Sequence, residues 1–164
     1  MFQTMRRKRQ ELSREDTAAI LERRASGVLA LAEEGGFPYA VPLSYVYTGD
    51  KLYFHCAKSG HKLELIRQNP KASFCVVDQD QIVPEEYTTY FRSAIVFGEL
   101  RVMEDGPEKR AAIEALAAKY DPEGPADGRQ KEIDREWGAL CVLEMKISHM
   151  TGKEAIELVR ARGK

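Results

Sequence analysis

The chain has 164 residues, a length typical of a single domain. Hydrophobic residues make up 43% of it and charged residues 31%, and the 25 basic and 26 acidic side chains nearly cancel to a net charge of −1. This composition is typical of a soluble globular protein with one sizeable core. It argues against a dedicated polyanion-binding domain, because such domains usually carry a strong basic excess.

The apolar runs are far shorter than the ~20 residues of a membrane-spanning helix, so we expect no membrane span. No apolar stretch follows the charged N-terminus, which argues against a signal peptide. The cysteines lie in apolar, strand-like runs without a CxxC motif, at Cys56, Cys75 and Cys141. Reduced cysteines of this kind are typical of cytoplasmic proteins, and no histidine stands at a metal-ligand spacing from them. We therefore expect a cytoplasmic protein without a metal site.

Turn and cap signals divide the chain into helices and strands. Ser13 followed by Asp16 predicts a helix start of the capping-box kind. The predicted helices lie at residues 14–24 and 62–67, after Gly106-Pro107, and at 153–162. The predicted strands lie at residues 28–32, 39–47, 51–56, 72–77, 88–103 and 139–147, and the predicted loops at 79–86 and 121–128.

Two residues inside predicted strands indicate irregular geometry. Pro42 cannot donate a ladder hydrogen bond, so it predicts a sheet edge, a bulge or a place where a ligand approaches. Gly98 predicts a bend or bulge, as at the corner of a barrel. About six strands with few helices predict an α+β fold built on a small antiparallel barrel. The chain has neither the strand–helix alternation nor a GxGxxG or P-loop motif, which argues against a doubly wound nucleotide-binding fold. We expect one domain over residues 1–164, with an N-terminal arm at 1–12 and a C-terminal tail at 153–164.

The stretch HCAKSGHK at residues 55–62 is the strongest candidate for a binding site. A strand ends there, a Ser59-Gly60 loop follows, and a helix opens with His61 and Lys62. Unpaired N–H groups at a helix start, together with a serine hydroxyl and a lysine, favour a phosphate or carboxylate. The alternative is an ordinary Ser59 N-cap beside solvated lysines.

Three further features carry two interpretations each. His55 is either a structural strand histidine or, beside the anion site, a proton-exchanging group, since imidazole titrates near neutrality. Arg92 lies in a β-rich run and needs either an Asp or Glu of the chain or a bound anion as its partner. The basic run at residues 6–9 is either a solvated or subunit-wrapping arm, which we favour, or a nucleic-acid contact.

In their order and spacing these segments resemble a known family. The succession MRRKRQELS, YAVPLSYVY, LYFHCAKSGHKLELIRQNP, YFRSAIVFGELRV and MTGKEA is similar to the pyridoxamine 5′-phosphate oxidase-like superfamily of split-barrel flavoproteins, and within it to the 5-nitroimidazole resistance (Nim) group. The resemblance extends over most of the chain, residues 5–154. It implies a six-stranded split barrel and a homodimer with FMN bound at the subunit interface.

The resemblance also assigns residues to the FMN site. It places the phosphate against Ser59, His61 and Lys62, with Gly60 in the same loop. The strand before the loop borders the flavin with His55, Cys56 and Ala57, and in the Nim group the histidine matching His55 is a candidate catalytic residue. The flavin ring rests along a second strand, at Val41, Pro42, Leu43, Ser44 and Tyr45. Arg92 and Ser93 match a family FRS/YRS element, and Thr151-Gly152-Lys153 matches a C-terminal signature that would finish the interface.

Two departures bear on the activity. Pyridoxamine phosphate oxidases proper carry an arginine where this chain has Ala40, and their C-terminal arginine–histidine element has no counterpart here, which argues against that reaction. We therefore expect an FMN-dependent oxidoreductase that reduces a small organic acceptor such as a nitroaromatic, with His55 as the proton donor. The alternative is a flavin- or haem-binding module that stores or senses its ligand without catalysis. We expect neither a nucleic acid nor a membrane as a partner.

Overall fold

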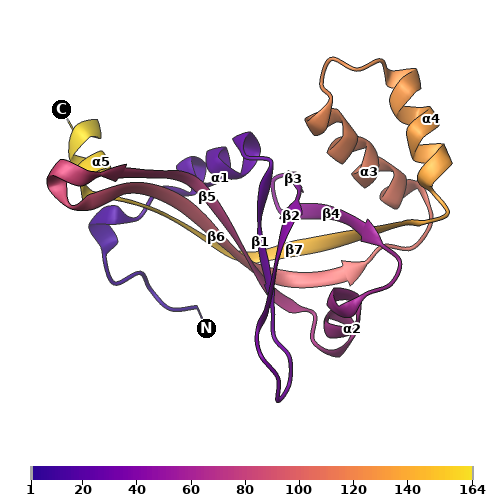
Figure 1. Ribbon diagram of the computed structural model, residues 1–164, viewed down its shortest axis with the longest axis horizontal. Helices are drawn as coiled ribbons and strands as arrows, with labels where there is room; N and C mark the ends of the chain where they lie inside the picture. The colour runs from indigo at the N-terminus through magenta and orange to yellow at the C-terminus, as the bar shows by residue number, and fades with distance from the viewer. Residues whose placement is uncertain (1, 164) are drawn as a thin grey trace.

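The structure is a computed structural model and describes residues 2–163, so Met1 of the predicted arm and Lys164 of the predicted tail lie outside it. It is built on one seven-stranded antiparallel sheet with the strand order β2-β1-β5-β6-β7-β4-β3 (Figure 1). The strands are β1 (Ser26–Leu31), β2 (Tyr39–Ser44), β3 (Val46–Tyr47), β4 (Lys51–Ala57), β5 (Lys71–Val83), β6 (Thr88–Val102) and β7 (Leu140–Glu154). The helices are α1 (Arg14–Arg23), α2 (His61–Gln68), α3 (Pro107–Tyr120), α4 (Ala126–Glu136) and α5 (Ile156–Arg162), with short 3₁₀ turns η1 (Lys8–Gln10) and η2 (Pro84–Glu86).

The sheet curls around its inner face. Phe54 on β4, Phe74 on β5 and Val96 on β6 are fully buried in one cluster, to which β1 and β7 also contribute. The rings of Phe54 and Phe74 meet edge to face at 5.0 Å between centroids. Strands from both halves of the sheet thus share one core, while β2 and β3 remain its two edges. The predicted α+β architecture with an open, split barrel is confirmed.

The prediction of six strands was wrong by one, because the run at residues 39–47 forms two strands. Tyr45 stands between β2 and β3 and is fully buried. Its N–H donates to the Ala25 carbonyl at 3.2 Å, and its hydroxyl donates to the Leu21 carbonyl at 2.8 Å. Burial raises the pKa of this hydroxyl. The inward turn at Tyr45 moves the chain from β1 to a new partner, so that β3 pairs with β4.

The two irregular strand residues occupy the positions that their chemistry predicts. Pro42 lies on β2, an edge strand that pairs only with β1, where the missing N–H costs no ladder hydrogen bond. Gly98 lies at a register shift between β6 and β7, and a Cβ there would collide with the Lys146 carbonyl oxygen. The bend at Gly98 lets β6 follow the curvature of the core.

The prediction of a loop at residues 79–86 was wrong. β5 continues to Val83 and pairs with the first half of β6 in a two-stranded ribbon, and only the turn η2 joins them. The side chains of this ribbon are largely exposed, for instance Ile82 at 72%. Its strands therefore lack the apolar alternation by which sequence patterns reveal a strand.

The helices were predicted with one omission. Ser13 caps α1 by accepting the Asp16 N–H at 3.0 Å, which confirms the predicted start. The predicted loop at residues 121–128 ends too late, because α4 begins at Ala126 and was missed. Ile133 is the only residue of α4 that is buried, so the helix has almost no apolar stripe to reveal it. Among residues 2–163, none of the helices combines the length and the apolar composition of a membrane span.

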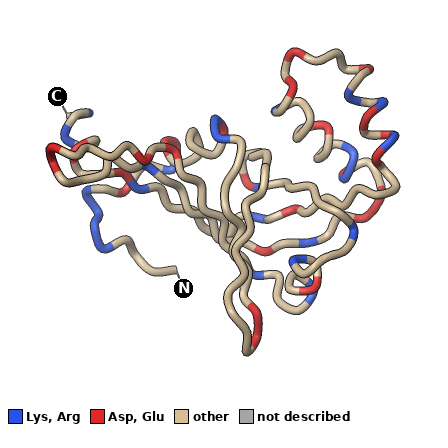
Figure 2. The backbone as a smooth tube through the Cα atoms, in the orientation of Figure 1, with Lys and Arg blue, Asp and Glu red and all other residues tan. Residues whose placement is uncertain are grey.

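The N-terminal arm docks on the end of β7. Leu12 N–H donates to the Gly152 carbonyl at 2.9 Å, and Glu11 bridges to Lys153. A Cβ at Gly152 would collide with Leu12 and Thr17, so the glycine permits this close approach. The basic run at residues 6–9 lies beside α5, and Figure 2 shows it as a continuous basic stretch of the arm. The predicted signature Thr151-Gly152-Lys153 therefore binds the arm within the chain.

A buried ion cluster joins α1 to the ribbon. Asp78 sits at a bulge of β5 and is buried, with a side-chain exposure of only 3%. Its Oδ1 accepts hydrogen bonds from Arg23 Nε and Arg24 Nε, both at 2.7 Å, and its Oδ2 accepts one from Arg92 at 3.3 Å. Burial alone would raise the pKa of Asp78, but the hydrogen bonds from the arginines outweigh it and hold the pKa well below its ordinary value.

We predict that Asp78→Asn lowers the free energy of unfolding by about 2 kcal/mol at pH 7, measured by urea denaturation. Because the folded pKa of Asp78 lies below the unfolded value, its contribution is complete above the ordinary aspartate pKa of about 4. This contribution is lost as the pH falls through the lowered folded pKa. The difference in unfolding free energy between wild type and variant should therefore become smaller in acid. Asp80→Asn, at an exposed neighbour on the same strand, is the control and should change little. An equal difference in unfolding free energy between wild type and Asp78→Asn at pH 7 and at pH 2 would contradict the prediction.

Candidate functional site

The predicted anion loop connects β4 to α2, and its helix begins at His61. Gly60 is the N-cap residue, with a φ of 134°, in the region that favours glycine. The alternative prediction of an ordinary serine cap at Ser59 was wrong, because no side chain of the described residues caps this helix end. The first turn thus presents backbone N–H groups without a capping side chain, and this is the arrangement that binds anions at helix starts.

The loop is accessible to a ligand. Ser59, Gly60 and His61 are exposed and Lys62 is half-buried. A Cβ built on Gly60 would meet nothing within 4 Å. The open space, the helix dipole and the lysine together favour a phosphate-sized anion.

His61 contacts the hairpin that joins β1 to β2. Its ring meets the Tyr39 ring edge to face at 4.9 Å between centroids. Its Nε2 lies 3.7 Å from Oε2 of Glu33, whose side chain is 37% exposed. Glu33 and Tyr39 were not predicted as site residues, because their approach to α2 depends on how the sheet curls and leaves no local sequence signal.

β4 carries His55 and Cys56 toward opposite faces of the sheet. Cys56 packs against the inner core, directly opposite Cys141 on β7. Burial, and then the neighbouring Cys141 thiol, raise the pKa of Cys56 to about 11, so at neutral pH it is a protonated thiol rather than a nucleophile. His55 is exposed on the outer face and lines a pocket under α3 and α4.

The predicted flavin strand, β2, presents its residues in alternation. Val41 and Leu43 are half-buried against the core, and Pro42 is exposed on the other face. Tyr45 lies wholly inside the core, where its ring packs edge to face on Phe74 at 5.0 Å. The accessible part of this strand therefore ends at Ser44.

The structure does not bring Arg92 and Ser93 to the anion loop within one chain. Arg92 donates to Asp78 at 3.3 Å and to Glu154 at 3.1 Å, so two carboxylates of the chain supply the partner that its burial requires. Glu154 is the last residue of β7, and α5 begins two residues later at Ile156. In Figure 1, α5 lies at the left end of the molecule, whereas α2 lies below the sheet at the lower right.

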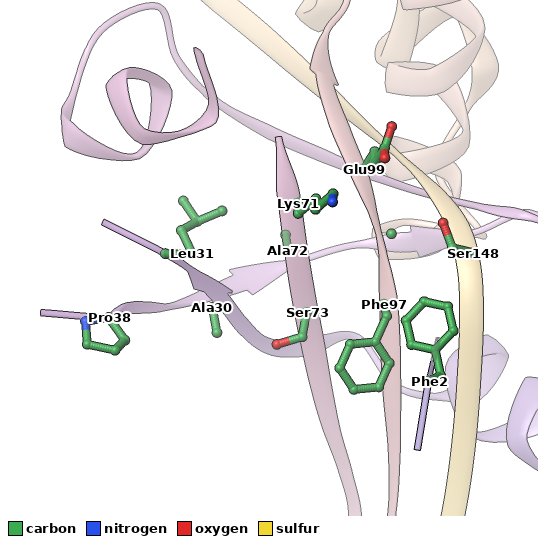
Figure 3. A pocket seen from close by; sticks show the side chains of 12 residues that line it. Phe2, Ala30, Leu31, Pro38, Lys71, Ala72, Ser73, Phe97, Glu99 and Ser148 are labelled. Atoms are coloured by element: carbon green, nitrogen blue, oxygen red, sulfur yellow. The ribbon is translucent and has the colours of Figure 1, made fainter. Parts of the chain in front are cut away.

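A second hollow, of about 540 Å³, lies on the outer face of β1, β5 and β6. Figure 3 shows Ala30, Ser73 and Phe97 pointing into it from neighbouring strands, with Phe2 of the arm beside Phe97. None of the residues predicted to bind a cofactor lines it. Among residues 2–163, no group of three or more His, Cys, Asp or Glu side chains is arranged to hold a metal ion.

Comparison with known proteins places the chain in a family. The family model for pyridoxamine 5′-phosphate oxidase matches residues 13–154. No curated protein matches the chain.

Three similar solved structures are 22% to 24% identical to this chain in sequence. A Bacteroides thetaiotaomicron protein described as a 5-nitroimidazole antibiotic resistance protein is 22% identical, with a TM-score of 0.71 over 88% of this chain and 86% of its own. An FAD-binding protein from Mesorhizobium loti is 24% identical, with a TM-score of 0.62 over 89% and 97% of the two chains. The FAD and heme binding protein from Mycobacterium smegmatis is 24% identical, with a TM-score of 0.74 over 95% and 80%. At these identities the similarity shows the fold alone.

We predict that Gly60→Ala lowers the affinity for FMN, the cofactor that the family resemblance implies. At φ 134° and ψ 164° the backbone of Gly60 is in a region used almost only by glycine, so a β-carbon there costs on the order of 1–3 kcal/mol and should change the loop conformation. Gly49→Ala is a matched control, since Gly49 also has a positive φ, of 74°, and also has open space around its Cβ position, but lies in the turn before β4. Both variants should lose stability in thermal denaturation, Gly60→Ala by at least as much as Gly49→Ala, and at a temperature where both are folded only Gly60→Ala should weaken binding in fluorescence titrations. Equal affinities of the two variants would contradict an anion site at Gly60.

Proposed function

Since the chain belongs to the pyridoxamine 5′-phosphate oxidase family, we propose that it binds FMN as a homodimer and reduces a small organic acceptor such as a nitroaromatic. The observation that carries the proposal is the uncapped start of α2 behind Gly60, with Lys62 in its first turn. The phosphate of FMN would take the place of the missing cap and accept hydrogen bonds from the first turn. Ser59 and His61 supply further donors at the same end.

The outer face of the sheet supports the presence of a second copy. One row of cross-strand neighbours runs from Pro42 through Val28, Cys75 and Ile95 to Thr151. Val28 and Ile95 are 41% and 38% exposed, and Val77 on the next row is 55% exposed. A contiguous apolar face across four strands is unusual on a monomer and is typical of a subunit interface. The hollow of Figure 3 lies on this same face.

His55 is the residue that we assign to proton transfer. It is exposed and lies on β4, five residues before Gly60, so a flavin held by the loop could extend back along this strand. When bound, the flavin supplies the electrons. The imidazole of His55 would hold a proton for the acceptor that receives them.

Oxidation of pyridoxamine phosphate is not part of the proposal. The position that carries an arginine in oxidases proper is Ala40, which is exposed on β2 opposite Ala30. No guanidinium is therefore present at this point of the strand to recognise the substrate phosphate. FAD is the second candidate cofactor, because two of the similar structures belong to FAD-binding proteins.

The function is tested with the purified protein and added flavin. We expect FMN to bind and shift the flavin absorbance, and the protein to elute as a dimer. After anaerobic reduction with dithionite, mixing with a nitroimidazole in a stopped-flow instrument should reoxidise the bound flavin. A protein that binds neither FMN nor FAD would overturn the proposal, and binding without reoxidation would favour the storage or sensor alternative, as would tight binding of haem.

We predict that His55→Ala retains FMN binding within about twofold and slows reoxidation by about 100-fold, because only the proton donor is removed. His55→Gln keeps a hydrogen-bond donor that cannot titrate, so it should be nearly as slow and should lose the pH dependence of the rate. The measurement is the stopped-flow rate between pH 5.5 and 8.5. Wild-type rates in both variants would exclude His55 as the proton donor.

A further inference from the structure

The pocket that His55 lines lies between the α3–α4 hairpin and the strands β4 and β7. It encloses about 450 Å³, within the range of small-molecule sites. Its apolar wall consists of Ile113, Leu116 and Ala117 on α3, Ile133 on α4 and Leu140 on β7. His55 contributes the polar group on the strand side.

The pocket has rigid supports on the α3 side. Lys109 is fully buried and donates to Asp105 and to the Leu140 carbonyl, both at 2.7 Å, which ties α3 to the start of β7. At the other end of α3, the Tyr120 hydroxyl donates to the Ala25 carbonyl at 2.6 Å. Arg110 then links α3 to α4 through Asp134 at 2.7 Å. These contacts hold α3 and α4 in place over β4 and β7.

The charged groups at the rim are mostly paired within the chain. Arg129 Nη1 donates to the carbonyls of Asp121 and Gly124, at 3.0 and 2.6 Å. Glu132 and Glu136 both pair with Arg135. Figure 2 shows the corresponding alternation of acidic and basic residues along α4. An anion entering here would meet these carboxylates and that of Asp121, with no lining cation beyond Arg129 and a protonated His55 to compensate, so the pocket disfavours anions.

We propose that this pocket binds an uncharged, mainly apolar ring compound, with His55 as its hydrogen-bond partner. The apolar wall favours binding, because removing apolar surface of the pocket and of the ligand from water lowers the free energy. One polar contact then orients the ligand. The pocket lies within a single chain and shares only His55 with the proposed flavin site, so it can be tested on the flavin-free protein without assuming that a flavin binds.

The pocket is tested on the flavin-free protein with two probes of the same ring skeleton. N-phenyl-1-naphthylamine is uncharged and fluoresces in apolar surroundings, and 1-anilinonaphthalene-8-sulfonate adds one negative charge. We expect saturable binding of the neutral probe, at least about tenfold tighter than binding of the sulfonate. Trp137, the only tryptophan of the chain, packs against the apolar cluster of the pocket, so its emission should be quenched by the bound probe.

Two matched substitutions locate the binding. Ala117→Phe places a ring in the pocket, whereas Ala118→Phe adds the same ring at the next position of α3, which does not line it. We expect Ala117→Phe to lower the affinity for the neutral probe by about tenfold or more. Ala118→Phe should change this affinity by less than about twofold. Circular dichroism and the thermal midpoint check that both variants are folded. Equal effects of the two substitutions, or equal affinity for both probes, would overturn the proposal, as would the absence of saturable binding.

Discussion

The alternation of side chains along the strands is the constraint from which the other features follow. Outside the β5–β6 ribbon the strands bury one face, and these inner faces curl around the cluster of Phe54 and Phe74. The outer faces of the strands must then be covered by other elements or remain exposed. On β4 and β7 that partner is the α3–α4 hairpin, whereas on β1, β5 and β6 the apolar outer row remains exposed. His55 and Cys56 show the consequence, since adjacent residues of one strand face a pocket and a core.

This constraint also explains where the candidate site can form. A curled sheet brings the β1–β2 hairpin against the start of α2, so that Tyr39 and Glu33 meet His61 from a distant part of the sequence. The start of α2 is left without a capping side chain at the same place. An uncapped helix start and an open sheet face thus result from one arrangement of strands. The proposed dimer would cover that face, and the proposed phosphate would complete that helix.

The parts of this structure that could be predicted from sequence are those with a local cause. The Ser13 cap, the bend at Gly98 and the proline on an edge strand each follow from the chemistry of one residue. The short helix after Ser59-Gly60 was also predicted, at residues 62–67, whereas Gly60 as its N-cap residue was not. The partner of Arg92 was harder to predict, because its position in a β-rich run required an anionic partner without specifying which one. Two carboxylates fill that role, and one of them, Asp78, is oriented by a bulge that no sequence pattern revealed.

The features that sequence reasoning missed are those whose cause is not local. The β5–β6 ribbon exposes most of its side chains, so its strands carry no periodic signal. α4 is held by Arg110 and by one buried isoleucine rather than by an apolar stripe. The division of one predicted strand at Tyr45 depends on a hydrogen bond to Leu21, 24 residues away in the chain.

The central claim is that the start of α2 holds the phosphate of a flavin nucleotide. Titration calorimetry with FMN and with riboflavin tests it directly, because the two ligands share the ring and the ribityl chain and differ only in the phosphate. The account predicts that FMN binds about 100-fold tighter than riboflavin, as several charge-assisted hydrogen bonds would require. Equal affinities of the two ligands would contradict a phosphate site at this helix.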